Sequence, residues 1–438
     1  MRQKFKLASI LISAAFLSAC GFDLGHHFDF LQNTAANVSE AVSDVSPGFM
    51  PLEPPEAEDE LKLVSKRVFV RHDDFTLGMY ETIDSIYLGA FIEDDSLLAG
   101  DIGMFERLSG VNHAIFAYRY TLGESFPIRF ILQSLARGKT PLIEIHPGEI
   151  WHIDYEIDYY QIEELARAFG QFDVPMFISF NASEAGLDMQ MSKDFFIALR
   201  KAFAYNVPKA AFVWSVSFES GSRSFDYYPG DEWVDWVGIT AFSNITEDGG
   251  HSDIFERLDN FYFNFHTRKP IMITSLGISN FSTVDHSYRI AEASAVIEYI
   301  YERIAVNYPR VKAIIYAGCR RETGGISQSH QLTDSDRLLI SYQVATSGDR
   351  FASEIKTELS GQKSSQWIKS RHDAKVIGDT VFISRQSLMD DFGASSLELD
   401  RRRDHIEIID GEPFFNAIIL PGSVIVDEKN AVILVSID

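Results

Sequence analysis

The strongest constraint on this chain is a regular alternation of β and α signals between residues 85 and 347. Eight short segments are apolar and rich in β-branched or aromatic residues, as buried strands are. They cover residues 86–92, 114–120, 141–146, 175–181, 211–217, 233–242, 270–275 and 312–318. Segments with a helical spacing of apolar residues separate them, at residues 126–136, 160–169, 193–204, 254–263 and 290–306. Eight strands joined by helical crossovers predict an α/β fold, a (β/α)8 TIM barrel over residues 76–350.

The most specific motif is the stretch at residues 212–244. It contains a strand-like segment, a turn at Pro229-Gly230-Asp231 and a second apolar segment, WVDWVGITAF. The order and spacing of these pieces resemble the strand pair before the nucleophile strand in glycoside hydrolase family 26, the β-mannanase-like enzymes. An α/β barrel of unrelated function is the alternative interpretation.

The resemblance implies two catalytic Glu residues at strand ends, and this chain departs from it at both. Retaining glycosidases need two carboxyl groups about 5–5.5 Å apart. The segment KPIMITSLG, which matches the family's strand seven, has Ser275 at the nucleophile position. Alignment of strand four on Pro175 and Gly186 places Ser183 at the acid/base position. A serine hydroxyl is not ionised near neutral pH. The resemblance therefore implies a glycan-binding or scaffolding protein that does not hydrolyse its ligand.

Other carboxylates keep an active enzyme open as an alternative. Glu184 follows Ser183 directly, so strand alternation turns its side chain to the opposite face unless a bulge intervenes. Glu219 lies just after the strand expected at residues 211–217. An endo-β-mannanase-like hydrolase would then use Glu184 and Glu219 as relocated carboxylates. A third possibility is a barrel that only contacts other envelope proteins.

Four further residues are candidates for ligand binding. His146 stands where the family resemblance places a Glu after strand three. Trp151, Trp214 and Tyr227 are aromatic residues on segments expected to reach the barrel mouth or core. Sugar rings stack on aromatic faces, so these residues are consistent with a polysaccharide or oligosaccharide partner, including a β-mannan-like one. Trp233 and Trp236 are instead interpreted as core residues.

The N-terminus predicts export and membrane attachment. Residues 1–19 combine a basic start with a short apolar run, and Leu17-Ser18-Ala19-Cys20 resembles a bacterial lipobox. That resemblance implies a lipid on Cys20 and a cell-membrane or outer-membrane anchor facing outside the cytoplasm. An ordinary secretory signal ending at Ala19 is the alternative. Residues 20–75, rich in Pro and acidic residues, are expected to form a flexible tether.

Net charge and cysteine content limit which partners, metals and cofactors are expected. The formal net charge of −24 disfavours nucleic acid, because phosphates would be repelled. The chain has two cysteines, Cys20 and Cys319, and no Cys/His cluster. No metal and no cofactor are expected, and Cys319 is expected to be a buried apolar residue near a strand end.

The last part of the chain is expected to form a small α+β domain at residues 374–438, after a junction at 351–373. Residues 376–383, 405–409, 417–420 and 431–437 have strand-like composition, and residues 385–392 have helical composition. The run GDTVFISR, with Phe392-Gly393-Ala394 after it, resembles the small "copper amine oxidase N-terminal-like" or stalk domain. The resemblance implies an envelope-associated interaction module without copper, and a generic α+β appendage is the alternative.

Overall fold

The computed structural model describes residues 63–148, 155–217, 222–284, 286–420, 422–428 and 431–436. The predicted signal peptide, Cys20 and the predicted tether up to residue 62 lie outside them. All described residues belong to one compact unit, Leu61–Asp438. No helix in this described part is long and apolar enough to cross a membrane.

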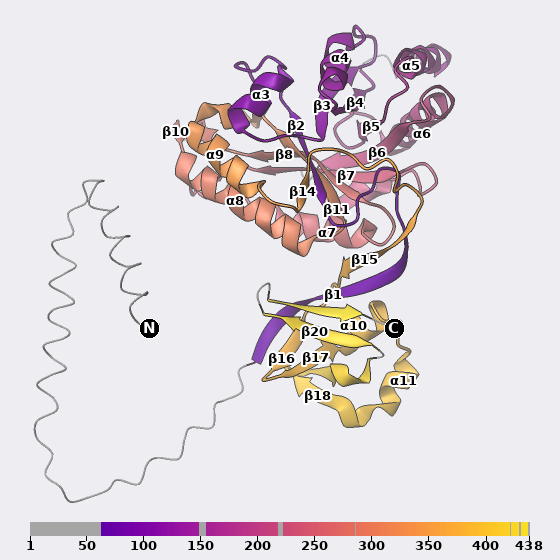
Figure 1. Ribbon diagram of the computed structural model, residues 1–438, viewed down its shortest axis with the longest axis vertical. Coiled ribbons are helices and arrows are strands. Elements are labelled where there is room, and N and C mark those ends of the chain that lie inside the picture. Colours follow the sequence, from indigo (N-terminus) through magenta and orange to yellow (C-terminus); the bar gives the residue numbers. More distant parts are fainter. Residues whose placement is uncertain are drawn as a thin grey trace, which may run out of the picture. The chain divides into compact units, whose positions relative to one another are not determined.

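A closed parallel barrel forms the larger part of this unit (Figure 1). Its eight strands follow one another around the sheet in chain order, and the last pairs with the first, with Ile314 opposite Leu88. The strands are β2 (Ile86–Phe91), β3 (Ile115–Thr121), β4 (Thr140–His146), β5 (Met176–Asn181), β6 (Ala210–Ser217), β7 (Trp236–Ser243), β8 (Ile271–Ile278) and β11 (Val311–Ala317). The predicted (β/α)8 fold and all eight predicted strands are confirmed.

Helices cover the outside of the barrel. They are α3 (Ile102–Ser109), α4 (Ile128–Ala136), α5 (Tyr155–Gly170), α6 (Met189–Asn206), α7 (Phe255–Phe265), α8 (Ile290–Asn307) and α9 (Asp336–Ala345). The connection from β6 to β7 contains the short 3-10 helix η5 (Ser222–Tyr227). The five predicted helical segments correspond to α4 through α8. Asp101 and Asp188 cap α3 and α6 by accepting backbone N–H groups, which explains why these helices begin where they do.

The lumen of the barrel is filled by buried side chains at its lower level, which is the half nearer the N-terminal ends of the strands. Tyr87, Phe177 and Trp236 fill it and are fully buried. The Trp236 indole donates a hydrogen bond to the Met79 carbonyl at 2.6 Å, so the core interpretation of Trp236 is confirmed. Gly89 lies at a close approach of strands, because a Cβ there would lie 2.3 Å from Cδ1 of Ile315 and 3.0 Å from the Ile115 carbonyl oxygen, so a larger residue would force these neighbours to shift. Within the lumen, such tight packing leaves no space for a ligand at this level.

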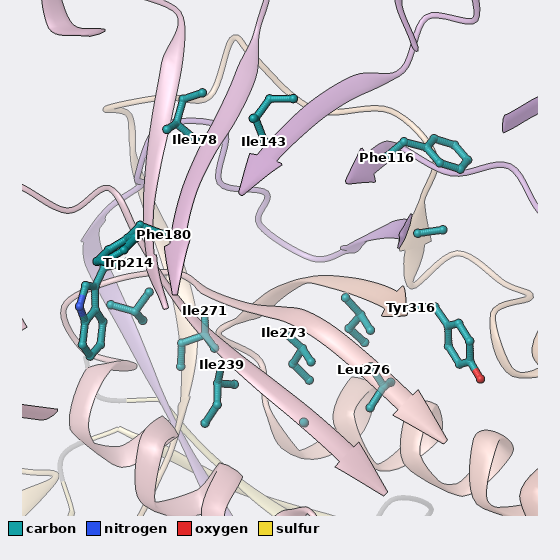
Figure 2. Close-up of a cluster of buried hydrophobic side chains, with 14 of the residues drawn as sticks. Phe116, Ile143, Ile178, Phe180, Trp214, Ile239, Ile271, Ile273, Leu276 and Tyr316 are labelled. Carbon is teal, nitrogen blue, oxygen red and sulfur yellow. The ribbon is translucent and has the colours of Figure 1, made fainter. Parts of the chain in front are cut away.

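A second apolar layer lies between the strands and the helices. Figure 2 shows part of it, with Ile143, Phe180 and Trp214 from neighbouring strands. These side chains alternate along each strand with those that face the lumen, as the two-residue period of a strand requires. Strands buried on both faces explain the nearly continuous apolar runs in the sequence.

The smaller domain contains a strand that the sequence did not predict. Residues Leu63–Thr76 form β1, which pairs with β16 (Ala374–Ile377), β21 (Val432–Ser436) and β15 (Lys363–Lys369). The predicted tether therefore ends too late, and the predicted junction at 351–373 includes a strand. Val68 and Val70 of β1 are buried in the core of this domain.

The rest of the domain follows the α+β prediction with two corrections. Residues 376–383 are not one strand but a hairpin of β16 and β17 (Thr380–Ser384), because Gly378 takes a left-handed turn with φ of 57°. Residues Ala417–Ile419 form the 3-10 helix η8 instead of a strand. The other elements are α10 (Arg385–Asp390), α11 (Ser396–Arg401), η7 (Arg403–His405), β18 (Ile406–Ile409), β19 (Glu412–Asn416) and β20 (Ser423–Asp427).

A buried ion pair secures the N-terminal end of the barrel. Nη1 of Arg310 lies 2.8 Å from Oε1 of Glu81, and both side chains are 0% exposed. The contact is one of charge, since the Arg310 N–H groups are not aligned on a hydrogen-bond acceptor among the described residues. Lys312 lies nearby, 3% exposed, and donates to the Ile83 carbonyl. Burial lowers the pKa of Lys312 to about 8, and the charge of Glu81 opposes that shift.

We expect Glu81→Gln to destabilise the fold strongly, because it leaves the Arg310 guanidinium buried without its counter-charge. Removing one partner of a buried pair costs about 3–5 kcal/mol. Urea unfolding measures this loss. The exposed contacts of Arg167 with Glu163 and Glu164 provide the control, and Arg167→Met should cost less than about 1 kcal/mol. Equal losses in the two variants would contradict the assignment.

We expect the stability of the wild type, relative to Lys312→Met, to rise with pH above pH 8. Between about pH 8 and 10.5 the unfolded chain keeps a proton on Lys312 that the folded chain has lost. Because the unfolded state then binds more protons, folding becomes more favourable by about 1.4 kcal/mol per pH unit. Urea unfolding of both proteins at several pH values measures this difference, and parallel pH profiles would refute it.

Candidate functional site

The carboxyl ends of the barrel strands surround two adjoining cavities at the mouth of the barrel. The first, the Glu144 cavity, has a volume of about 320 Å3 and is lined by Arg119, Thr121, Glu144, Ile145, His146, Phe180, Asn181 and Glu184. The second, the Ser275 cavity, measures about 120 Å3, and Asp94, Thr240, Phe242, Ser275, Cys319 and Arg321 are among its lining residues. Arg119 and Glu184 line both cavities. This end of the barrel is where active sites of the fold lie.

Arg119 is the central charge of the mouth. Its Nε donates to Oε1 of Glu144 at 2.9 Å, which joins neighbouring strands β3 and β4. The charge of Glu144, with smaller contributions from Glu184 and Asp94, raises the pKa of Arg119. The guanidinium therefore stays charged and holds Glu144 as a carboxylate partner.

Glu184 reaches the mouth through a turn. Its backbone N–H donates to the Asn181 carbonyl at 3.3 Å, directly after β5 ends. In a continuing strand, alternation would direct the Glu184 side chain away from the mouth. The turn redirects it toward the mouth, so Glu184 reaches the site through a turn and not through the bulge that the sequence analysis considered. Oε1 of Glu184 lies 3.8 Å from Nη2 of Arg321, whose guanidinium lies over the Phe242 ring at 4.1 Å. Glu219, the proposed second carboxylate, lies outside the described residues.

The two serines that the sequence resemblance assigns to catalytic positions have different surroundings. The Ser183 hydroxyl accepts the Ser217 backbone N–H at 2.7 Å and donates to Oδ1 of Asn181 at 3.1 Å. Ser275 lies at a bulge in β8, where the register with β7 shifts between Ile239 and Thr240, and it lines the smaller cavity. Its hydroxyl makes no hydrogen bond to the part of the chain that the structure describes. Ser183 is therefore a structural link, and Ser275 faces ligand space.

Among the predicted ligand-binding residues, His146 lies at the mouth. It lines the Glu144 cavity, and its Nδ1 accepts the Gly148 backbone N–H at 3.1 Å. In the neutral ring the proton is then on Nε2, which serves as a hydrogen-bond donor. Trp151 lies outside the described residues.

Trp214 and Tyr227 lie away from the mouth, which corrects the sequence prediction for both. Trp214 is 0% exposed between β6 and the helix layer, and its indole donates to the Tyr227 carbonyl at 3.1 Å. It offers no ring face to a ligand. Tyr227 is half-buried against the same layer and lines neither mouth cavity.

Cys319 lines the Ser275 cavity as a neutral thiol. It is 5% exposed, as expected for a buried residue near a strand end, and burial raises its pKa to about 12. Across the described ranges, no three His, Cys, Asp or Glu side chains are grouped as metal ligands.

The arrangement suits recognition of hydroxyl groups. The carboxylates of Glu144 and Glu184 accept hydrogen bonds, and Arg119, Arg321 and His146 donate them. Sugar hydroxyls both donate and accept, so they can bridge such pairs. Sequence reasoning missed Arg119, Glu144 and Arg321. A signal for Glu144 was present, because residues two apart on a strand share a face and Glu144 is two residues before His146.

Several solved structures are similar to this chain. A GH26 beta-mannanase from Bacteroides ovatus has a TM-score of 0.44 at 10% identity, over 61% of this chain and 90% of that one. A modular endo-beta-1,4-mannanase from Cellulomonas fimi has a TM-score of 0.46 at 14% identity, over 78% and 94%. A GH26 endo-beta-1,4-mannanase catalytic domain from Bacillus sp. JAMB-750 has a TM-score of 0.45 at 13% identity, over 64% and 93%. No protein-family model and no curated protein sequence matches the chain. Likenesses this low leave the barrel assignment resting on the strand pairings of this chain.

We expect Ser183→Ala to destabilise the protein by about 1–3 kcal/mol, because it removes the acceptor of a buried backbone N–H at Ser217. Ser275→Ala is the matched control at the same end of the barrel and should change stability by less than about 0.5 kcal/mol. Urea unfolding of both variants measures the difference. A larger loss for Ser275→Ala would show that the two roles are reversed.

Proposed function

We propose that this protein is an exported, lipid-anchored envelope protein that binds a glycan without hydrolysing it. The observation that carries the proposal is the chemistry of the mouth. Serines occupy both positions where the family resemblance calls for Glu, and the Ser183 hydroxyl is engaged with Ser217 and Asn181. The carboxylate of Glu144 is held by Arg119. At the positions of Ser183 and Ser275 there is therefore no carboxyl group to serve as the acid or as the nucleophile of a retaining mechanism.

The size and lining of the site support a glycan ligand. A volume of about 320 Å3 is at the lower end of the range for small-molecule sites, which is about 300–1,000 Å3. Charged and amide side chains line the larger cavity, among them Arg119, Glu144, Asn181 and Glu184. The resemblance to β-mannanase-like enzymes makes a β-mannan-like chain the first ligand to test.

The proposed location rests on the sequence of the N-terminus. The lipobox-like run ending at Cys20 supports a lipid anchor, with the barrel outside the cytoplasm. The net charge of −24 leaves nucleic acid an unfavourable partner.

Binding tests the proposal directly. We expect the full-length protein to bind at least one of β-mannan, galactomannan, xylan, mixed-linkage β-glucan and peptidoglycan glycan in affinity electrophoresis. Arg119→Met should weaken that binding about tenfold or more, because the Arg119 guanidinium lines both cavities. The exposed Arg167→Met is the charge-matched control and should bind as the wild type does. Retention of none of these glycans would refute the proposal.

A second candidate function, glycan hydrolysis, is favoured by one observation. Glu184 and Glu144 line the same cavity, so a relocated pair of carboxylates has a place to act, with Glu219 as the other partner considered. Reducing-end release from the same glycans distinguishes the two functions. We expect no release by the wild type. Release that is lost in Glu184→Gln would establish the enzyme instead, and Ser183→Glu/Ser275→Glu tests whether restored carboxylates give activity.

A further inference from the structure

A further cavity lies at the opposite end of the barrel from the two mouth cavities. It measures about 260 Å3 and is bordered by the segment entering β2, by the end of α8 and the start of β11, and by β15. Its apolar wall includes Ile86, Val306, Val311 and Trp367. It shares no lining residue with the mouth cavities and does not depend on the proposed glycan binding.

The buried charges beside this cavity do not balance. Arg310 and Lys312 are 0% and 3% exposed, and the buried anion beside them is Glu81, at 0%. Asp84, the other carboxylate that acts on Lys312, lines the cavity together with Asp427 and Arg350, but it is exposed and therefore does not supply a buried counter-charge. Buried charges are normally paired, because an unpaired one has lost its hydration without compensation. One further negative charge at Lys312 would balance this cluster.

Two hydrogen-bond donors are available at the same place. The Lys312 ammonium donates to the Ile83 carbonyl and to Oε1 of Gln366 at 3.2 Å. Its third N–H can then donate to a further acceptor. The contact between Lys312 and Gln366 also fixes the Gln366 amide with its oxygen toward the cation. Nε2 of Gln366 is then buried and has no hydrogen-bond partner among the described residues. Gln366 is 3% exposed, and both residues line the cavity.

We propose that this cavity binds a small amphipathic anion, whose carboxylate contacts Lys312 and Gln366 and whose apolar tail packs on Trp367 and Val306. The anion supplies the missing buried charge and accepts the unused N–H groups. The apolar wall accounts for the tail, since burying apolar surface stabilises a complex. A water molecule occupies about 30 Å3 in the liquid, so about 260 Å3 holds about nine heavy atoms.

Octanoate, with about that number of heavy atoms, is the probe. Its binding to the full-length protein is measured by calorimetry and by Trp fluorescence, with octan-1-ol and octylamine as the neutral and cationic controls. We expect octanoate to bind about ten- to a hundredfold more tightly than either control, as a charge-assisted hydrogen bond would give. Equal affinity for octanoate and octan-1-ol, or no binding of octanoate at millimolar concentration, would overturn the proposal.

Three variants locate the site. Lys312→Met should weaken octanoate binding about tenfold or more, and Gln366→Met should weaken it by a smaller factor. Val306→Trp leaves both donors in place and fills the cavity from the end of α8, so it should abolish binding while the circular dichroism spectrum stays that of the wild type. Trp367→Phe should remove the fluorescence change but not the heat of binding. Unchanged affinity in Val306→Trp would refute the site even if Lys312→Met does not fold.

Discussion

The pairing of β11 with β2 closes the barrel, and this closure determines where the side chains of the core and of the site lie. Once eight parallel strands form a ring, alternate side chains must point into one shared lumen and all carboxyl ends must meet at one face. At the lower level, Tyr87, Phe177 and Trp236 are among the buried side chains that pack in the lumen. At the upper level, the same strand faces present Arg119 and Glu144 instead, so one geometric rule produces both the core and the site.

The barrel could be predicted from the sequence because its strands are buried on both faces and appear as apolar runs. Strand β1 has no such signal, because charged residues interrupt it and its partner β15 lies about 300 residues away in the chain. Pairing over that distance is decided by tertiary context, which local propensity does not contain. The β16–β17 hairpin was merged into one strand because the turn at Gly378 was not recognised.

The site was only partly accessible to the same reasoning. The sequence motif points to Ser183 and Ser275, but Glu144 lies within β4, before the strand end where catalytic carboxylates are expected. Trp214 was misplaced although its position could be derived, since its neighbours Val213 and Ser215 face the lumen and alternation sends Trp214 outward. The turn that brings Glu184 to the mouth depends on backbone geometry after β5, and no residue pattern specified it.

The mouth of the barrel and the cavity at its opposite end differ in the balance of their charges. At the mouth, Arg119 and Arg321 are paired with Glu144 and Glu184, so the proposed neutral glycan would meet a balanced surface. At the other end, Arg310 and Lys312 outnumber Glu81, so an anion is favoured once it has arrived. The chain as a whole carries a net charge of −24, which repels an approaching anion. At an ionic strength of about 0.1 M, salt screens this repulsion beyond about 10 Å. Salt should therefore speed the association of an amphipathic anion and leave that of a neutral glycan unchanged, because only the anion approaches against the charge of the protein.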